Sequence, residues 1–170
     1  MINEFRVNYV KNSLIASDMI EKIIELKKQY WNYSSESHKK WIEDNINDDE
    51  YHLWIENKGG EILAYLNIVF LKIQFDDNFE EVIGIGNVCV NNKTSGKGIG
   101  LLLMQICNYY INCHEKRATL LCKKKLSSFY QKSGWKLFTG KVLFQGSKYK
   151  EILMLNELPD AVNVVIERNY

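Results

Sequence analysis

Three glycines stand at alternate positions near the middle of the chain, and their spacing is typical of an anion-binding turn. Gly96, Gly98 and Gly100 lie between a stretch of alternating apolar residues and an apolar run with helical spacing. Because glycine has no Cβ, backbone N–H groups there can face an anion, and a helix beginning at this point adds the positive end of its dipole. Lys93 and Lys97 add positive charge. The segment predicts a phosphate cradle, and a glycine-rich turn without a ligand is the alternative.

Two well-known phosphate-binding loops do not fit this spacing. A P-loop ends in Gly-Lys-Ser/Thr, whereas Lys97 is followed by Gly98. A dinucleotide-binding turn needs Gly-x-Gly-x-x-Gly early in a strand–helix–strand unit. Here the third glycine comes one position too early, and the segment lies past the middle of the chain. The remaining interpretation is a strand, a glycine turn and a helix that bind an anion through the backbone.

The elements that must position this turn are indicated by the hydrophobic pattern on either side of it. Upstream, residues 80–90 alternate as a strand, whose small and apolar positions are expected on one face: Val82, Gly84, Gly86, Val88 and Val90. Downstream, a stripe with helical spacing predicts an amphipathic helix: Ile99, Leu102, Leu103, Ile106 and Tyr110. A strand therefore leads into the glycines, and a helix leaves them.

The rest of the chain supplies further strands and helices. Strands are predicted at residues 5–9, 51–56, 61–75, 118–122, 135–138 and 150–156. Helices are predicted after a capping box at Asp18, from about Ser35, and before a stop at Gly134. The segment after Pro159 is left unassigned. This order of elements predicts one mixed α/β (α+β) domain over residues 1–170.

Composition and charge exclude several classes of function. The 170 residues carry a formal net charge of +1, which is too little to indicate nucleic-acid binding as the main role. No apolar run reaches the roughly 18 residues that span a bilayer, and the first residues do not resemble a signal peptide. The four cysteines form no Cys-x-x-Cys pair and the three histidines are scattered, so no metal is expected. Free thiols favour a cytoplasmic location.

Two motifs together resemble the GNAT superfamily of acyl-CoA N-acyltransferases. The family's acyl-CoA motif runs Val-x-Val, a short linker and Arg/Gln-x-x-Gly-x-Gly/Ala, and here it reads VCV at residues 88–90, NN, and KTSGKGIG at residues 93–100. Its second motif, Asn-x-x-Ala-x-x-Phe-Tyr-x-x-x-Gly-Phe, is matched at Phe129, Tyr130, Gly134 and Trp135, with Lys123 and Leu126 at the Asn and Ala positions. The resemblance is specific over about residues 80–137.

The resemblance implies a fold, a co-substrate and a set of donor contacts. The implied fold is a central, twisted, mostly antiparallel sheet flanked by helices, with splayed central strands. Acetyl-CoA is the implied co-substrate, and its expected contacts are Val88, Cys89, Val90, Lys93, Ser95, Gly96, Lys97, Gly98, Ile99, Gly100, Leu101 and Lys123. A bulge within residues 87–90 is expected to aim a backbone N–H at the thioester oxygen.

By the same resemblance, Tyr130 is the general acid that gives a proton to the leaving thiolate. A packed aromatic with a satisfied hydroxyl is the alternative for this tyrosine. The acceptor is expected to contact Trp31, Tyr33, Glu36 and Asn87, where ordinary packing of the aromatic residues is the alternative. No clear general base is present: Glu80, Glu81 and His52 are weak candidates, and deprotonation through water is as good an interpretation.

The resulting hypothesis is direct transfer of an acetyl group from acetyl-CoA to a primary amine of a small molecule. The alternatives are an acyl-CoA-binding regulatory module with weak catalysis, and acetylation of a protein amine. The segment FYQKSGWKLFTGKVLF is also similar, more weakly, to the aminoglycoside N-acetyltransferase branch, although Gly86 and Asn87 stand where that branch carries an acid. No nucleic acid or membrane partner is expected, and the protein is expected to be a monomer or a homodimer.

Overall fold

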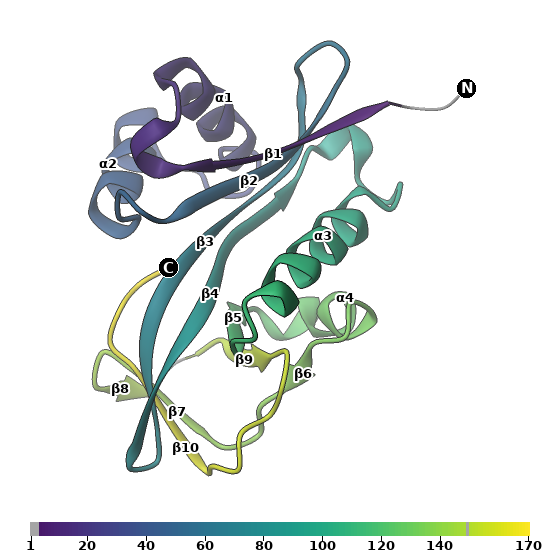
Figure 1. The fold of residues 1–170 in the computed structure, drawn as a ribbon. Helices are drawn as coiled ribbons and strands as arrows, with labels where there is room; N and C mark the ends of the chain where they lie inside the picture. The colour runs from purple at the N-terminus through teal and green to yellow at the C-terminus, as the bar shows by residue number, and fades with distance from the viewer. Residues whose placement is uncertain (1–3, 149) are drawn as a thin grey trace.

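A long antiparallel pair of strands runs through the centre of the protein in the computed structural model, which describes residues 4–148 and 150–170 (Figure 1). The pair consists of β3 (Ile62–Phe75) and β4 (Asn78–Val90). Its turn contains Asp76 at a φ of 49°, and the Asp76 carboxylate accepts hydrogen bonds from the backbone N–H groups of Val162 and Asn163. The turn of the central hairpin is therefore tied to the last part of the chain.

The other elements extend this hairpin into one sheet with helices on both faces. The N-terminal part contains β1 (Phe5–Lys11), α1 (Ser17–Lys27), α2 (Ser35–Asn45) and β2 (Tyr51–Asn57). After the hairpin come α3 (Ile99–Cys113), β5 (Ala118–Cys122), α4 (Ser127–Lys132), β6 (Lys136–Leu137), β7 (Lys141–Phe144), β8 (Ser147–Lys148), β9 (Ile152–Leu155) and β10 (Asn163–Ile166). Short 3-10 turns lie at residues 12–14, 92–94 and 124–126.

The sheet order is β6-β9-β5-β4-β3-β10-β7-β8, and β2 also pairs with β3 and carries β1. Only two of these pairings are parallel among the described strands, β4 with β5 and β7 with β10. The prediction of a mixed α/β fold with a mostly antiparallel sheet is confirmed. The unassigned segment after Pro159 supplies β10, which pairs with both β3 and β7.

Neighbouring residues of β3 face opposite layers of the molecule. Ala64 and Leu66 pack in the core that contains α3 residues, whereas Tyr65 between them packs with α1 residues such as Ile23. Side chains alternate across a strand, so α1 and α3 cover opposite faces of the sheet. This arrangement is visible in Figure 1, where α1 and α2 lie on the other side of the central hairpin from α3 and α4.

The central strands β4 and β5 separate along their length. They pair in parallel only from Ile83 to Ile85 on β4, opposite Ala118 to Leu120 on β5. Beyond that point β4 continues to Val90 beside β3, whereas β5 continues beside β9. The expected splay of the central strands is confirmed, and it leaves one edge of the last residues of β4 without a neighbouring strand.

One predicted helix start is wrong in detail. Asp18 was expected to cap α1, but the cap position is Ala16, and no side chain hydrogen-bonds there. Asp18 instead lies in the first turn, where a carboxylate still interacts favourably with the helix dipole. The capping pattern therefore marked the right region but placed the boundary two residues too late. The second helix begins at Ser35 as predicted, capped by the Ser34 hydroxyl.

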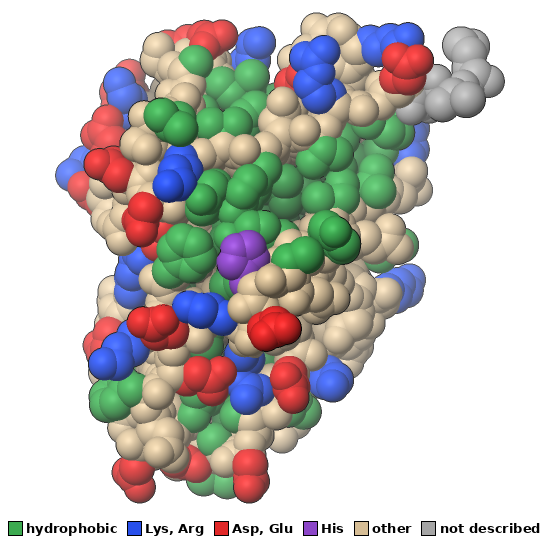
Figure 2. All heavy atoms as spheres, viewed as in Figure 1, with side chains coloured by type: hydrophobic (Ala, Val, Ile, Leu, Met, Phe, Trp, Pro, Cys, Tyr) green, Lys and Arg blue, Asp and Glu red, His purple; other side chains and the backbone are tan. Residues whose placement is uncertain are grey.

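Figure 2 shows hydrophobic side chains gathered in a band across one face of the molecule. On β1, Phe5, Val7 and Tyr9 are at least a third exposed. The Tyr9 ring stacks on Tyr51, with centroids 4.2 Å apart, and lies 4.8 Å from the ring of Tyr110 on α3. No helix within residues 4–148 and 150–170 has the length and hydropathy of a membrane span.

Candidate active site

A bulge interrupts β4 immediately before the glycine turn. Tyr65 and Asn67 of β3 pair with Cys89 and Gly86 of β4, so two residues of β4 oppose the single residue between Tyr65 and Asn67. Asn87 lies in this bulge at a φ of 52°, a conformation that asparagine tolerates better than most residues. Its side-chain amide donates to the Asn67 Oδ1 at 2.6 Å, which holds the bulge to the neighbouring strand.

The bulge changes which residues of β4 face each layer. The sequence pattern predicted that alternate residues from Val82 to Val90 share one face, and this is wrong. Before the bulge, Ile83 and Ile85 belong to the core on the α3 side, whereas Val82 packs in a different cluster. After it, Val88 and Val90 pack on the α3 side instead. One extra residue shifts the alternation by one position, and the pattern alone does not show it.

The three glycines serve two structural needs. Gly96 and Gly98 have φ values of 77° and 83°, which favour glycine strongly, and Gly98 is the residue before α3. Gly100 lies inside the first turn of α3, where a Cβ would come within 3.0 Å of Val90 and 3.3 Å of Phe129. The turn is exposed, and the first backbone N–H groups of a 15-residue helix follow it. This geometry fits a pyrophosphate group.

A cavity of about 990 Å³ lies beside the bulge and between the splayed strands. It brings together nine of the predicted site residues: Trp31, Tyr33, Asn87, Val88, Cys89, Val90, Ser95, Lys123 and Tyr130. The remaining predicted residues are not among its lining: Glu36, Lys93, Gly96, Lys97, Gly98, Ile99, Gly100 and Leu101. Glu36 is exposed in the first turn of α2, and Lys93 forms an exposed ion pair with Glu61 at 3.2 Å.

Tyr130 lies at the cavity with its ring buried and 5 % exposed. Burial is the main cause that raises the pKa of its phenol, and Cys122, Cys89 and Glu151 add to the effect. Its hydroxyl has no hydrogen-bond partner among the described residues. The phenol therefore stays protonated throughout the neutral range, and its proton is available to a group bound in the cavity.

Lys27 is a lining residue that the sequence analysis missed. Its side chain is 2 % exposed, and its ammonium group lies 4.5 Å from the centroid of the Trp41 ring. Burial lowers its pKa to about 8. The signal was present in the sequence: Lys27 follows Ile20, Ile23 and Ile24 at helical spacing, so a lysine occupies the buried stripe of α1.

The last described residues also line the cavity, which the sequence analysis did not foresee. A Cβ on Gly86 would lie 2.5 Å from the Tyr170 carbonyl carbon, and one on Gly84 would lie 3.0 Å from the Tyr170 ring. The Tyr170 hydroxyl is 3.2 Å from the Thr119 hydroxyl on β5. The two glycines of β4 therefore make room for Tyr170, and no local pattern connects these distant segments.

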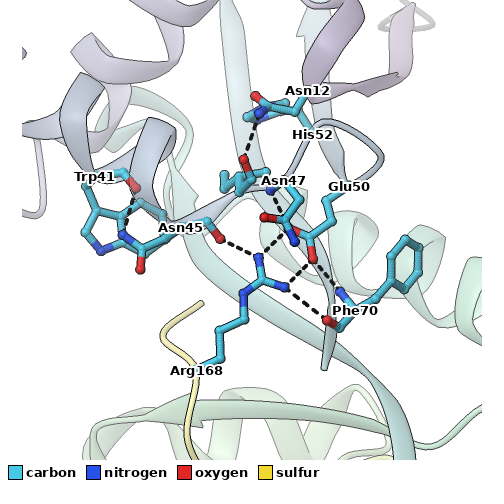
Figure 3. A network of polar contacts seen from close by, with 9 residues as sticks. Asn12, Trp41, Asn45, Asn47, Glu50, His52, Phe70 and Arg168 are labelled. Atoms are coloured by element: carbon cyan, nitrogen blue, oxygen red, sulfur yellow. Dashed lines mark hydrogen bonds and ion pairs between the residues drawn. The ribbon is translucent and has the colours of Figure 1, made fainter. Parts of the chain in front are cut away.

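Residues 168–170 form a tail that carries Tyr170. Arg168 of this tail forms an ion pair with Glu50, which lies just before β2 (Figure 3). The Arg168 guanidinium contacts both Glu50 carboxylate oxygens at 2.5 Å and donates to the carbonyl oxygens of Asn45 and Phe70. Glu50, 1 % exposed, also accepts from the Phe70 backbone N–H at 2.8 Å. The pair thus supplies hydrogen-bond partners for the backbone N–H and carbonyl groups of Phe70 on β3. Phe70 lies between the part of β3 that pairs with β2 and the part that pairs with β10.

The weak candidates for a general base lie away from the cavity. His52 is buried between the Tyr65 hydroxyl and the Asn12 side chain, and burial lowers its pKa to about 4 (Figure 3 shows the Asn12 side). Glu80 pairs with Arg117 and Glu81 with Lys116. None of these three candidates lines the cavity. Within the described part of the chain, no group of His, Cys, Asp and Glu side chains could hold a metal ion.

Comparisons with known proteins agree with this fold. No curated protein matches the chain. Among solved structures, Escherichia coli ElaA is 21% identical with a TM-score of 0.66, and the match covers 91% of this chain and 100% of ElaA. An acyl-CoA N-acyltransferase from Pseudomonas aeruginosa is 16% identical with a TM-score of 0.67, over 89% of this chain and 99% of that one.

A third solved structure contains CoA. The GNAT family N-acetyltransferase YhbS from Escherichia coli, in complex with CoA, is 15% identical with a TM-score of 0.66, over 97% of this chain and 89% of that one. Identities this low establish a shared fold. The family itself is established by a family profile described as acetyltransferase (GNAT) domain, which matches residues 16–151. With the bulged β4, the splay beside β5 and the glycine turn before α3, the chain belongs to the GNAT acetyltransferase family.

Proposed function

We propose that this protein transfers an acetyl group from acetyl-CoA directly to a primary amine of a small molecule. The observation that carries the proposal is Tyr130, a buried and protonated phenol at a cavity between the splayed strands. An acyl-CoA-binding module would need the donor site alone. A proton donor beside the place where the thioester sulfur would lie is a feature of catalysis.

The donor side of the site fits acyl-CoA. The turn before α3 presents backbone N–H groups and the positive helix end to a pyrophosphate, and Lys97 and Lys93 lie on the same exposed segment. The outer edge of β4 at Val88 and Val90 is free of a neighbouring strand, so its backbone groups can pair with the amides of an extended chain such as pantetheine. The Val90 carbonyl oxygen already accepts a hydrogen bond from the Tyr30 hydroxyl at 2.5 Å, so an amide that pairs there shares this acceptor or replaces Tyr30.

The reaction then follows from these groups. When bound, acetyl-CoA supplies an electrophilic thioester carbon. The bulge at residues 87–88 directs a backbone N–H toward the carbonyl oxygen and stabilises the charge that develops there. The amine nitrogen forms a bond to that carbon as the carbon–sulfur bond breaks, and Tyr130 gives its proton to the departing thiolate. Water in the cavity takes the proton that the amine loses, and the Tyr130 phenolate regains one from solvent.

The size and contents of the cavity support a small acceptor. About 990 Å³ has to receive both the acetyl end of the donor and the amine. Trp31 and Tyr33, after α1, line the part of the cavity next to α2. A protein amine remains the alternative acceptor. The four thiols are not in disulfides, which supports a reducing compartment such as the cytoplasm.

The test is an acceptor screen that measures the release of free CoA thiol from acetyl-CoA. A panel of small primary amines is compared with peptides that carry lysine or a free N-terminus. Transfer to at least one small amine, abolished or strongly reduced in the Tyr130→Phe variant, is the expected result. Binding of acetyl-CoA without transfer to any amine would favour the regulatory module instead.

A further inference from the structure

We propose that Lys27 binds an anionic group, a carboxylate or a phosphate, on the acceptor, so that the substrate is an amine that carries a negative charge. This inference rests on the proposed function and deepens it by naming the chemical class of the acceptor.

The position of Lys27 is fixed by the packing of α1 on the sheet. It lies in the last turn of α1, on the same face as Ile23 and Ile24, and its side chain lines the cavity together with Cys89 of β4. One turn further, the Tyr30 hydroxyl is bonded to the Val90 carbonyl oxygen, which holds the end of α1 over the end of β4. Lys27 is thus located on the α1 side of the same cavity that Tyr130 lines from α4.

The ammonium group of Lys27 has no anionic partner in the described part of the chain. The ion pairs of the neighbouring residues of α1 and α2 go elsewhere: Lys28 pairs with Glu25, and Lys40 pairs with Asp44. The Lys27 ammonium lies instead over the face of the Trp41 ring. A cation–π contact recovers only part of the hydration energy that a buried charge loses, so this contact alone leaves the charge undercompensated.

The charged side chains that line the cavity are mostly positive. Across the whole cavity, the charged lining residues are Lys27, Lys123, Lys125 and Glu151. A polycationic acceptor would be repelled by this lining, so the structure argues against the charge pattern of an aminoglycoside.

An acceptor of the proposed class uses the cavity from both ends. Its anionic group lies against the Lys27 ammonium, which restores the hydrogen bonds and the opposite charge that burial removed. Its amine reaches toward the bulge of β4, where Asn87 and Tyr130 line the cavity. Trp41 keeps the ammonium in place before the anion arrives.

The test pairs amines that share a skeleton and differ in charge. β-Alanine is compared with β-alaninamide, and O-phosphoethanolamine with ethanolamine, so that carboxylate and phosphate are judged separately, and spermidine serves as a polycation. At neutral pH the wild type is expected to favour one charged member over its neutral partner by at least about tenfold in kcat/KM. In Lys27→Met this ratio falls toward one. In Lys28→Met, the neighbouring exposed lysine, it is unchanged.

A second measurement does not depend on transfer. Trp41 lies directly beneath the Lys27 ammonium, so its fluorescence should change when an anion binds there. Inorganic phosphate or propionate is expected to give a saturable change in the wild type and in Lys28→Met. Propionamide is expected to give none, and neither anion is expected to give one in Lys27→Met, whose folding is verified by circular dichroism.

The outcomes separate this inference from the proposed function. The inference is overturned if no anion gives a Lys27-dependent signal, or if the neutral amines or spermidine are preferred. It is also overturned if folded Lys27→Met still prefers the anionic amines over their neutral partners. Failure of every amine to release thiol, with the Lys27-dependent anion signal intact, counts against the proposed transfer and leaves Lys27 as an anion site.

Discussion

Arg168 and Glu50 join the end of the chain to the edge of the central hairpin, with the two side chains 2.5 Å apart. The carboxylate is almost fully buried, and the guanidinium is 31% exposed. Glu50 also accepts from the Phe70 backbone N–H, and Arg168 donates to the Phe70 carbonyl oxygen. The pair therefore links three segments that are far apart in sequence. It holds the segment that leads to Tyr170 in place beside the cavity.

The first prediction concerns this ion pair. Arg168→Met leaves the Glu50 carboxylate buried without its partner and should lower the free energy of unfolding by about 3 kcal/mol. Lys40→Met, which breaks the exposed pair between Lys40 and Asp44, should change it by less than about 1 kcal/mol. Urea denaturation of both variants measures the difference. Equal losses would show that the tail is not held through this contact.

The second prediction concerns the proton donor. Tyr130→Phe removes the hydroxyl and keeps the packing of the ring, so kcat should fall by about 10²–10⁴-fold. The Kd of acetyl-CoA should stay within about twofold, because the phenol is not needed to hold the donor. Steady-state thiol release and calorimetric titration measure the two quantities. Unchanged turnover at saturating substrate would remove Tyr130 from the mechanism.

The third prediction concerns the glycine turn. Gly98→Ala places a side chain at a φ of 83° and should cost about 1–2 kcal/mol of stability. Gly60→Ala is the matched control, because Gly60 has a φ of 75° and equally open space around it, in the turn between β2 and β3. Only Gly98→Ala should also raise the Kd of acetyl-CoA. Similar Kd values for the two variants would exclude the turn from donor binding.

The fourth prediction concerns the acceptor side. Tyr170→Ala opens the space above Gly84 and Gly86 without touching the glycine turn. The preference for bulky over small amines should rise by roughly tenfold in kcat/KM, while the KM of acetyl-CoA stays the same. Tyr109→Ala, on the exposed side of α3, is the control. An amine preference identical in the wild type and Tyr170→Ala would mean that Tyr170 only packs against the sheet.

The fifth prediction is a pH dependence of stability that comes from Lys27. Its pKa is about 8 in the folded protein and about 10.5 when the chain is unfolded. Between these values the unfolded chain binds more protons, so stability should rise with pH relative to Lys27→Met, by up to about 3 kcal/mol. Lys27 also lowers the pKa values of Cys89, His38 and His52. The two imidazoles titrate below the pH range of the comparison, and Cys89, whose pKa burial raises to about 12, stays protonated in both proteins. If the free energies of unfolding of the two proteins changed in parallel from pH 7 to 10.5, the lowered pKa of Lys27 would be contradicted.

Local patterns predicted the strand, the glycine turn and the helix proposed to bind the donor. The alternation of residues 80–90, the glycines and the helical stripe that follows them all act within about twenty residues, and each reports on backbone conformation directly. The bulge was expected only from the family resemblance. Its effect on the faces of β4 was missed, because the pattern before Gly86 and the pattern after Asn87 each look regular on their own.

The part of the cavity proposed to receive the acceptor depends on contacts between distant segments, which a local pattern does not contain. Tyr170 reaches Gly84 and Gly86 across more than eighty positions in sequence, and Arg168 reaches Glu50 across 118. Lys27 did leave a local sign, a charge in an apolar stripe. Its burial beside the cavity and its contact with the Trp41 ring became visible only in the structure.

The path of the last residues has a practical consequence for handling the protein. Tyr170 lies against Gly86 and lines the cavity, so a bulky group attached to this segment would lie next to the bulge. A label or a substitution on residues 168–170 would therefore change the space left for the proposed acceptor. Acceptor kinetics are best measured on protein in which these residues are unaltered.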